Sequence, residues 1–145
     1  MSTVAQRAVI EAQSWVGTPY RHQASCKGAG TDCLGLLRGI WRHLYGDEPE
    51  EIPAYTADWS EPQGREDLLH AARRHLIRKS KHEEAAGDVI LFRMRRRSVA
   101  KHLGLQTAVG PDRQFVHAYS GHGVELSALT QPWRARIAAR FTLPD

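Results

Sequence analysis

The chain has 145 residues, the length of a single domain, and 41% hydrophobic and 25% charged residues, which exclude a disordered chain. Its 20 lysines and arginines outnumber 16 acidic residues, so a net charge of +4 permits an anionic polymer as partner without requiring one. No apolar run approaches the roughly 20 residues of a membrane span, and Met1 to Ile10 lacks a signal-peptide core. We expect one domain over residues 1–145, made in the cytoplasm without a signal peptide.

The first expected helix covers residues 4–16, where apolar side chains recur at helical spacing. Thr3 and Gln6 occupy the positions of a capping box, and Gly17 is suited to end the helix. Residues 20–31 are rich in small and polar side chains and are expected to form a loop.

A second helix is expected over residues 33–45, with Asp32 as its N-cap and Gly46 as its stop. An acidic, proline-containing loop is expected to follow over residues 47–62. A third helix is then expected over about residues 65–77, with its leucines facing inward.

The pattern changes after Gly87 to short apolar runs that are typical of strands. A turn is expected at residues 110–113, where Gly and Pro occur together. The expected strands cover residues 88–92, 103–109, 114–119, 123–126 and 137–142. Helices followed by strands indicate an α+β fold with N-terminal helices packed on an antiparallel sheet.

Cys33 is the first candidate for chemistry because it is expected in the first turn of the second helix. The unpaired N–H groups and positive dipole of a helix start stabilise an anion, so this position favours a reactive thiolate. The same N–H groups could receive the oxyanion of a tetrahedral intermediate. The alternative is a small buried residue that packs the helix start.

His102 and His117 stand apart from the other six histidines because they lie in expected strands. Neighbouring antiparallel strands could place the two side by side, facing Cys33. A nucleophilic cysteine needs a base, and the base needs an orienting group, so these histidines could supply both. They could also be two structural histidines of the sheet.

Five segments resemble, in order, the motifs of the NlpC-type cell-wall peptidases, which are papain-like cysteine peptidases. The segments are WVGTPY at 15–20, TDCLGLL at 31–37, GDVILF at 87–92, KHLGL at 101–105 and FVHA at 115–118. The resemblance implies a papain-like α+β fold in which Cys33 is the nucleophile, His102 the base and His117 the orienting residue. It also implies that Tyr20 and Asp32 help to hold the free amino end of a substrate.

The resemblance further implies a cysteine endopeptidase that cleaves peptidoglycan stem peptides, usually between γ-D-glutamate and the diamino acid, without a metal or other cofactor. Three further segments most resemble the branch found in phages and gene-transfer agents, whose members are tail-associated. They are HQAS at 22–25, LYG at 44–46 and WR at 133–134. This branch implies a virion or tail location, tail or hub proteins as partners, and action on the wall of a recipient cell.

Four other interpretations remain open. The first is a zinc site, although Cys26 and Cys33 are farther apart in sequence than zinc ligands usually are. The second is a disulfide between these cysteines, which would abolish the nucleophile. The third is nucleic-acid binding by the basic run at 93–101, which lacks interleaved aromatic residues for base stacking, so a solvated hairpin tip or a docking surface is favoured. The fourth is a catalytically idle tail component that retains the peptidase fold.

Overall fold

The computed structural model describes residues 2–51 and 65–145, so most of the loop expected at 47–62 lies outside the described residues. The elements in chain order are α1 (Val4–Ser14), β1 (Ser25–Cys26), β2 (Gly30–Thr31), α2 (Cys33–Tyr45), α3 (Asp67–His75), β3 (Ile77–Lys79), β4 (Val89–Arg93), β5 (Ala100–Ala108), η2 (Gly110–Asp112), β6 (Gln114–Tyr119), β7 (Gly123–Ala128), α4 (Gln131–Arg134) and β8 (Ile137–Thr142).

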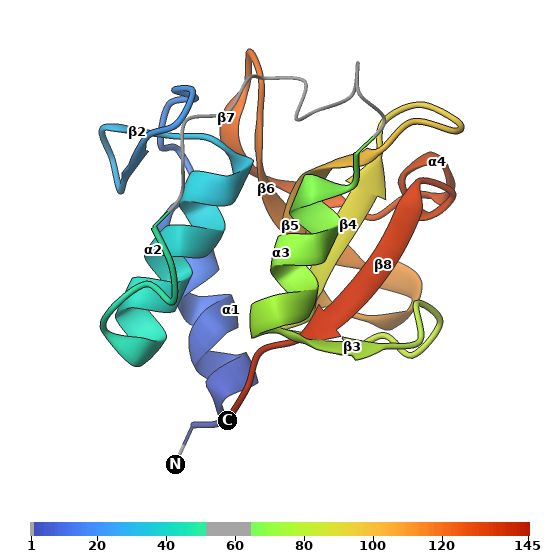
Figure 1. Cartoon of the computed structure of the whole chain (residues 1–145), viewed down its shortest axis with the longest axis horizontal. Helices are drawn as coiled ribbons and strands as arrows, with labels where there is room; N and C mark the ends of the chain where they lie inside the picture. Colours follow the sequence, from blue (N-terminus) through green and yellow to red (C-terminus); the bar gives the residue numbers. More distant parts are fainter. Residues whose placement is uncertain (1, 52–64) are drawn as a thin grey trace.

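The main sheet has six antiparallel strands in the order β3-β8-β4-β5-β6-β7. Helices α1, α2 and α3 cover one face of the sheet, with α1 and α2 packed side by side and α3 against β5 (Figure 1). The expected α+β fold with N-terminal helices on an antiparallel sheet is therefore confirmed.

The two long helices begin where their caps predict. Thr3 and Gln6 form the capping box of α1, and the Asp32 side chain accepts a hydrogen bond from the Gly35 N–H at the start of α2. Because the first turn of α2 is fixed in this way, Cys33 lies at the helix start as predicted.

The third helix ends earlier than predicted. It stops at His75, Leu76 is already extended, and Ile77 begins the short edge strand β3, so the helix expected up to Ile77 is wrong at its end. The side chain of Ile77 is 56% exposed, which shows why an apolar residue at helical spacing was misleading here.

The β5 strand separates two apolar clusters because its successive side chains face opposite ways. Leu103 and Leu105 join the large core beneath the helices. The ring of His102 instead packs 5.8 Å from Phe92, which belongs to the smaller cluster partly covered by Trp133 of α4. The histidine therefore lies among aromatic rings at the start of the strand.

None of the helices in the described part of the chain has the length and apolar character needed to cross a membrane.

Candidate active site

Cys33 lies at the start of α2, where its side chain is only 8% exposed. Its Sγ atom lies 3.9 Å from the backbone oxygen of Lys101, the residue immediately before His102. The helix start and the beginning of β5 are therefore in direct contact, which brings the predicted nucleophile next to the strand that carries the predicted base.

Gly35 allows the preceding loop to pack closely on the first turn of α2. A Cβ atom at this position would lie 1.9 Å from the Ala24 backbone oxygen and 2.5 Å from the Thr31 hydroxyl. Neither neighbour is a flexible chain end that could move away. Glycine in the segment around Cys33 is thus required by packing, and it helps to fix the position of the thiol.

His102 and His117 are brought together as the sequence predicts. The Nε2 atom of His102 and the Nδ1 atom of His117 are 2.9 Å apart, which is hydrogen-bond distance. Gly104 lies on β5, next to β6, which carries His117. A Cβ atom at this position would lie 3.2 Å from the Cβ of His117 and 2.8 Å from a ring carbon of Phe115. Glycine at 104 therefore gives the histidine pair its space.

Further side chains complete the surroundings of the histidine pair. The other ring nitrogen of His117, Nε2, lies 2.9 Å from the Ser127 hydroxyl on β7. The ring of Trp133 lies edge-on to His117, with centroids 5.2 Å apart, and Tyr119 lies 5.8 Å from His102. Sequence reasoning missed Ser127, because one serine in a strand carries no local signal of its partner.

Burial keeps both imidazoles neutral near neutral pH. It lowers the pKa of His102 to about 3, with a smaller contribution from the neighbouring His117. It also lowers the pKa of His117 to about 4, helped by His122. Neutral histidine has one donor and one acceptor nitrogen, so the pair can form an ordered hydrogen-bonded chain.

The expectation of a lowered thiol pKa is wrong for this structure. Burial raises the pKa of the Cys33 thiol to about 12, and the carboxylate of Asp32 raises it further, whereas backbone N–H groups at Leu103, Leu34 and Cys33 itself lower it. The helix start does act in the predicted direction, but loss of solvation outweighs it. The resting site therefore holds a thiol beside a neutral imidazole.

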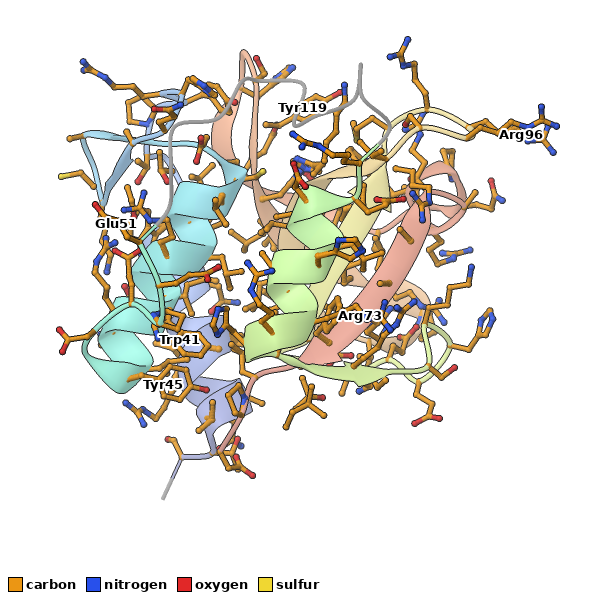
Figure 2. All side chains as sticks on the ribbon, in the orientation of Figure 1. Trp41, Tyr45, Glu51, Arg73, Arg96 and Tyr119 are labelled. Carbon is orange, nitrogen blue, oxygen red and sulfur yellow. The ribbon has the colours of Figure 1, made fainter. Side chains whose placement is uncertain are left out.

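Cys33 and His102, the candidate nucleophile and base, both line one cleft of about 200 Å³. Its walls contain Tyr20, His22, Asp32, Cys33, Met94, Lys101, His102, Ala118, Tyr119 and Ser120. Tyr119 lies at the same end of the molecule as the start of α2, between the helical and strand halves (Figure 2). All the predicted site residues except His117 thus line the cleft, and His117 lies behind His102.

Asp32 and Tyr20 form one side of this cleft. The carboxylate of Asp32 accepts hydrogen bonds from the Gly35 and Gln23 N–H groups, each at 2.7 Å, and His22 Nδ1 lies 3.8 Å from it. Burial raises the pKa of Tyr20 to about 12, with Cys33 and Asp32 adding to the effect, so its hydroxyl stays protonated. His22 also lines the cleft, and its place there was not predicted from the sequence.

The two cysteines are both free thiols, with Cys26 exposed on β1 and Cys33 buried. In the described residues, no group of three or more histidine, cysteine and acidic side chains is arranged to hold a metal ion.

The basic run divides into a paired residue and an exposed tip. Arg93 forms an ion pair with Glu66 and also donates to the Ser98 backbone oxygen at 2.9 Å. The side chains at 95–97 are exposed, and Arg96 projects away from the body of the protein at the end of the hairpin (Figure 2). Arg93 is therefore tied into the fold, and the exposed arginines of the run lie at 95–97.

A cysteine at a helix start that shares a cleft with one of two hydrogen-bonded histidines has the parts of a nucleophile with its base and orienting group. Residues 17–141 match the NlpC/P60 family along their length. The chain belongs to the NlpC/P60 family.

Two relatives are similar to the chain in sequence, and one solved structure is similar to it in fold. The chain is 32% identical over 84% of its length to a probable endopeptidase NlpC homolog of Haemophilus influenzae. It is 28% identical over 92% of its length to the murein DD-endopeptidase MepS/murein LD-carboxypeptidase of Escherichia coli K12. It spans only 53% and 60% of these relatives. A crystal structure of an NlpC/P60 family protein from Bacillus cereus superposes with a TM-score of 0.66, at 20% identity, over 97% of this chain and 40% of that one.

Proposed function

We propose that the protein is a cysteine peptidase that cleaves peptidoglycan stem peptides. The observation that carries this proposal is the convergence of the Cys33 thiol and the His102 imidazole on one cleft, with His117 hydrogen-bonded behind the imidazole. The names of the endopeptidase relatives support the substrate class. A catalytically idle protein with the same fold is the competing possibility, which the experiment below distinguishes.

In the first half of the reaction, the Cys33 sulfur attacks the scissile carbonyl while its proton passes to His102. The receiving atom is Nδ1, because Nε2 is engaged with His117. The tetrahedral oxyanion is stabilised by backbone N–H groups at the helix start. The imidazolium then protonates the leaving amine as the C–N bond breaks, which leaves a thioester on Cys33.

In the second half, water attacks the thioester carbonyl and His102 removes its proton. Collapse of the second tetrahedral intermediate breaks the C–S bond and releases a carboxylic acid, while the imidazolium returns its proton to the sulfur. The neutral resting pair suits this sequence, because the thiol and imidazole exchange a proton only when the substrate carbonyl is in place. No step requires a metal or a cofactor.

We assign the bond between γ-D-glutamate and the diamino acid as the site of cleavage, with Tyr20 and Asp32 holding the free amino end. Two observations support this assignment: both residues line the cleft, and Asp32 contributes a carboxylate that is 2% exposed. A buried carboxylate attracts an ammonium group more strongly than an exposed one does. An Asp32→Asn variant keeps one oxygen that can cap α2, so it should raise KM for stem peptides with a free amino end more than it does for those with a blocked one.

Digestion of purified muropeptides, followed by mass analysis, tests both the activity and the bond. We expect wild type and the Cys26→Ala control to release dipeptides ending in D-glutamate, and Cys33→Ala to release nothing while keeping its melting temperature. Cleavage between the two D-residues of a cross-link would overturn the bond assignment alone. No cleavage of any muropeptide by the folded wild type would favour the idle component.

We further propose that the protein acts from a phage-like tail on the wall of a recipient cell, with residues 95–97 as the docking surface. The exposed tip of the β4–β5 hairpin supports this proposal, as does the resemblance of three segments to tail-associated proteins. Individual surface ion pairs are weak, so several arginines would be needed to hold a partner.

Purification of tail-like particles tests this location. The protein should copurify with them in fewer copies than the tube subunit. Changing Arg95, Arg96 and Arg97 to Glu should release it without lowering activity on soluble muropeptides. The matched control changes three scattered exposed arginines, Arg7, Arg73 and Arg78, to Glu and should stay attached. Particles without the protein would overturn the tail location, and a tip variant that stays attached would overturn the docking surface.

A further inference from the structure

Ser127 extends the histidine pair into a chain of three side chains. It lies on β7 directly opposite Phe115. Because Phe115 and His117 face the same side of the sheet, Ser127 is the diagonal neighbour of His117 on that face. Its hydroxyl oxygen is 2.9 Å from His117 Nε2, while His117 Nδ1 is 2.9 Å from His102 Nε2. Both ring nitrogens of His117 therefore have a side-chain partner.

The direction of the hydrogen bonds in this chain decides whether His102 can act as a base. To accept a proton at Nδ1, the neutral His102 ring must carry its hydrogen on Nε2 and donate it to His117. His117 must then accept at Nδ1 and carry its own hydrogen on Nε2, which points to Ser127 Oγ. The reverse direction places the hydrogen of His102 on Nδ1, where it blocks proton transfer.

The requirement becomes stricter when His102 is charged. An imidazolium donates from both nitrogens, so His117 can only accept at Nδ1 and donate from Nε2. An acceptor at the position of Ser127 stabilises this state, because the hydrogen bond from the charged ring polarises the next one along the chain. A donor without a lone pair at 127 would oppose it.

We propose that Ser127 is a positioning residue that holds His117 in the Nε2–H tautomer and so keeps His102 Nδ1 open for the Cys33 proton. The catalytic part of this inference rests on the proposed peptidase function. The structural part, the tautomer of the two rings, does not depend on turnover and can be measured alone. Further ionisable groups near the pair are His122, Glu125, which lies opposite His117, and Tyr119, whose ring is 5.6 Å from that of His117.

Two substitutions of equal shape separate the hydroxyl from the space it fills. Ser127→Thr keeps an acceptor, whereas Ser127→Val has the same branched shape without one, and both suit a strand. We expect the Thr variant to keep kcat close to wild type. The Val variant should lose about tenfold in kcat with KM unchanged, a fraction of the roughly 10²–10⁴-fold that general acid–base catalysis provides.

A third substitution tests the direction of the hydrogen bond between His117 and the side chain at position 127. Ser127→Asp provides acceptors without a donor, so it should retain kcat and move the acid limb of kcat/KM to higher pH. A residue that only fills space would give neither the split between Thr and Val nor the shifted limb.

Nitrogen-15 NMR of the histidine rings gives the readout that is independent of activity. In wild type and Ser127→Thr, His102 Nδ1 should resonate as a bare ring nitrogen and His117 Nε2 as a protonated one. In Ser127→Val both rings should show mixed tautomers. Identical tautomers in the Thr and Val variants would overturn the proposal. A wild type with the expected tautomers and no turnover would overturn the peptidase function instead, leaving the structural role of Ser127 in place.

Discussion

At the scale of single residues, Cys33 shows two opposed effects on one thiol. The N–H groups at the start of α2 lower its pKa, as the sequence predicts, whereas burial and Asp32 raise it to about 12. The sequence identifies the helix start but not how deeply the Cys33 thiol is buried, because burial depends on the residues from other elements that pack against it. The extent of burial thus decides whether the pKa is raised or lowered.

The pH dependence of thiol alkylation follows from this balance. With iodoacetamide, the rate of Cys33 labelling should keep rising from pH 7 to pH 10 and show no plateau below pH 9, because the thiolate fraction increases throughout this range. Free cysteine in the same buffers, with its thiol pKa of about 8.5, should instead level off above that pH. Labelling of Cys33 that is already maximal at pH 6 would show a thiolate–imidazolium resting pair.

The two histidines should differ in how replaceable they are. His102→Ala should abolish measurable kcat, because it removes the base that takes the proton of Cys33 and later returns it to the leaving amine. His117→Ala should cost less, about 10–100-fold, since water can partly replace an orienting group. His117→Asn should recover part of that loss, because its amide oxygen can still accept from the His102 ring. Equal loss from every change at 117, measured as kcat on muropeptides, would indicate a structural histidine.

The site residues that sequence reasoning found are those whose residue type and neighbourhood are both unusual. Cys33 follows an N-cap, and His102 and His117 interrupt apolar strands. Ser127 and His22 carry no local sign of a role in the site, and only the strand register and the fold of the loop bring them to it. Their roles depend on distant partners, which a local pattern does not contain.

At the scale of elements, local signals predicted α1, α2, β6 and β8 closely because caps, turns and alternation all lie within these segments. The short strands β1 and β2, which lie within the loop expected at 20–31, were missed, as were the short β3 and α4. The three residues of β3 pair only with the C-terminal strand β8, more than 60 positions away, so their conformation is imposed by tertiary pairing. The end of the third helix was misplaced for the same reason.

The buried ion pair between Asp88 and Arg140 ties β4 and β8 together. Arg140 is 1% exposed, and its Nη1 donates to Asp88 at 2.9 Å and to Gln106 at 2.5 Å. Arg140→Met should lower the free energy of unfolding by about 3–5 kcal/mol, because it leaves a buried carboxylate short of a partner. Lys79, 3.1 Å from the same carboxylate, should keep the loss near the lower figure.

Urea denaturation measures this effect against a matched control. Arg78→Met changes an exposed arginine on the adjacent edge strand and should alter the free energy of unfolding by less than about 0.5 kcal/mol. Equal effects of the two variants would mean that the ion pair contributes no more than a surface charge does.

At the scale of the whole molecule, the order of elements along the chain was predictable and the order of strands in the sheet was not. The C-terminal strand β8 inserts between β3 and β4 (Figure 1), so the last strand of the chain has two partners that precede it. No local pattern specifies such a pairing. This pairing of β8 with β4 brings Arg140 to Asp88, which lies in the GDVILF segment. A strand that is distant in sequence therefore supplies the partner of a residue in a family-like segment.

The acid sensitivity of the folded state is a property of the whole molecule that the histidine pair predicts. Their pKa values of about 3 and about 4 in the folded protein lie below the usual 6.5, so the unfolded chain binds more protons as pH falls. Stability is therefore fully present above about pH 6.5 and decreases towards pH 4. Each histidine should add a slope of up to about 1.4 kcal/mol per pH unit.

Urea unfolding measured at intervals between pH 7 and pH 5 tests this slope before most carboxylates titrate. The glutamine in His117→Gln cannot take up a proton. The unfolding free energy of this variant should therefore change less steeply with pH than that of wild type, and the difference should correspond to the uptake of almost one proton. A wild-type slope equal to that of His117→Gln would mean that His117 has the same pKa in the folded protein as in the unfolded chain. Its ring would then be protonated over most of the range from pH 6.5 to pH 5, where it could not accept a hydrogen bond from His102, and the hydrogen bonds behind His102 would have to run in another direction.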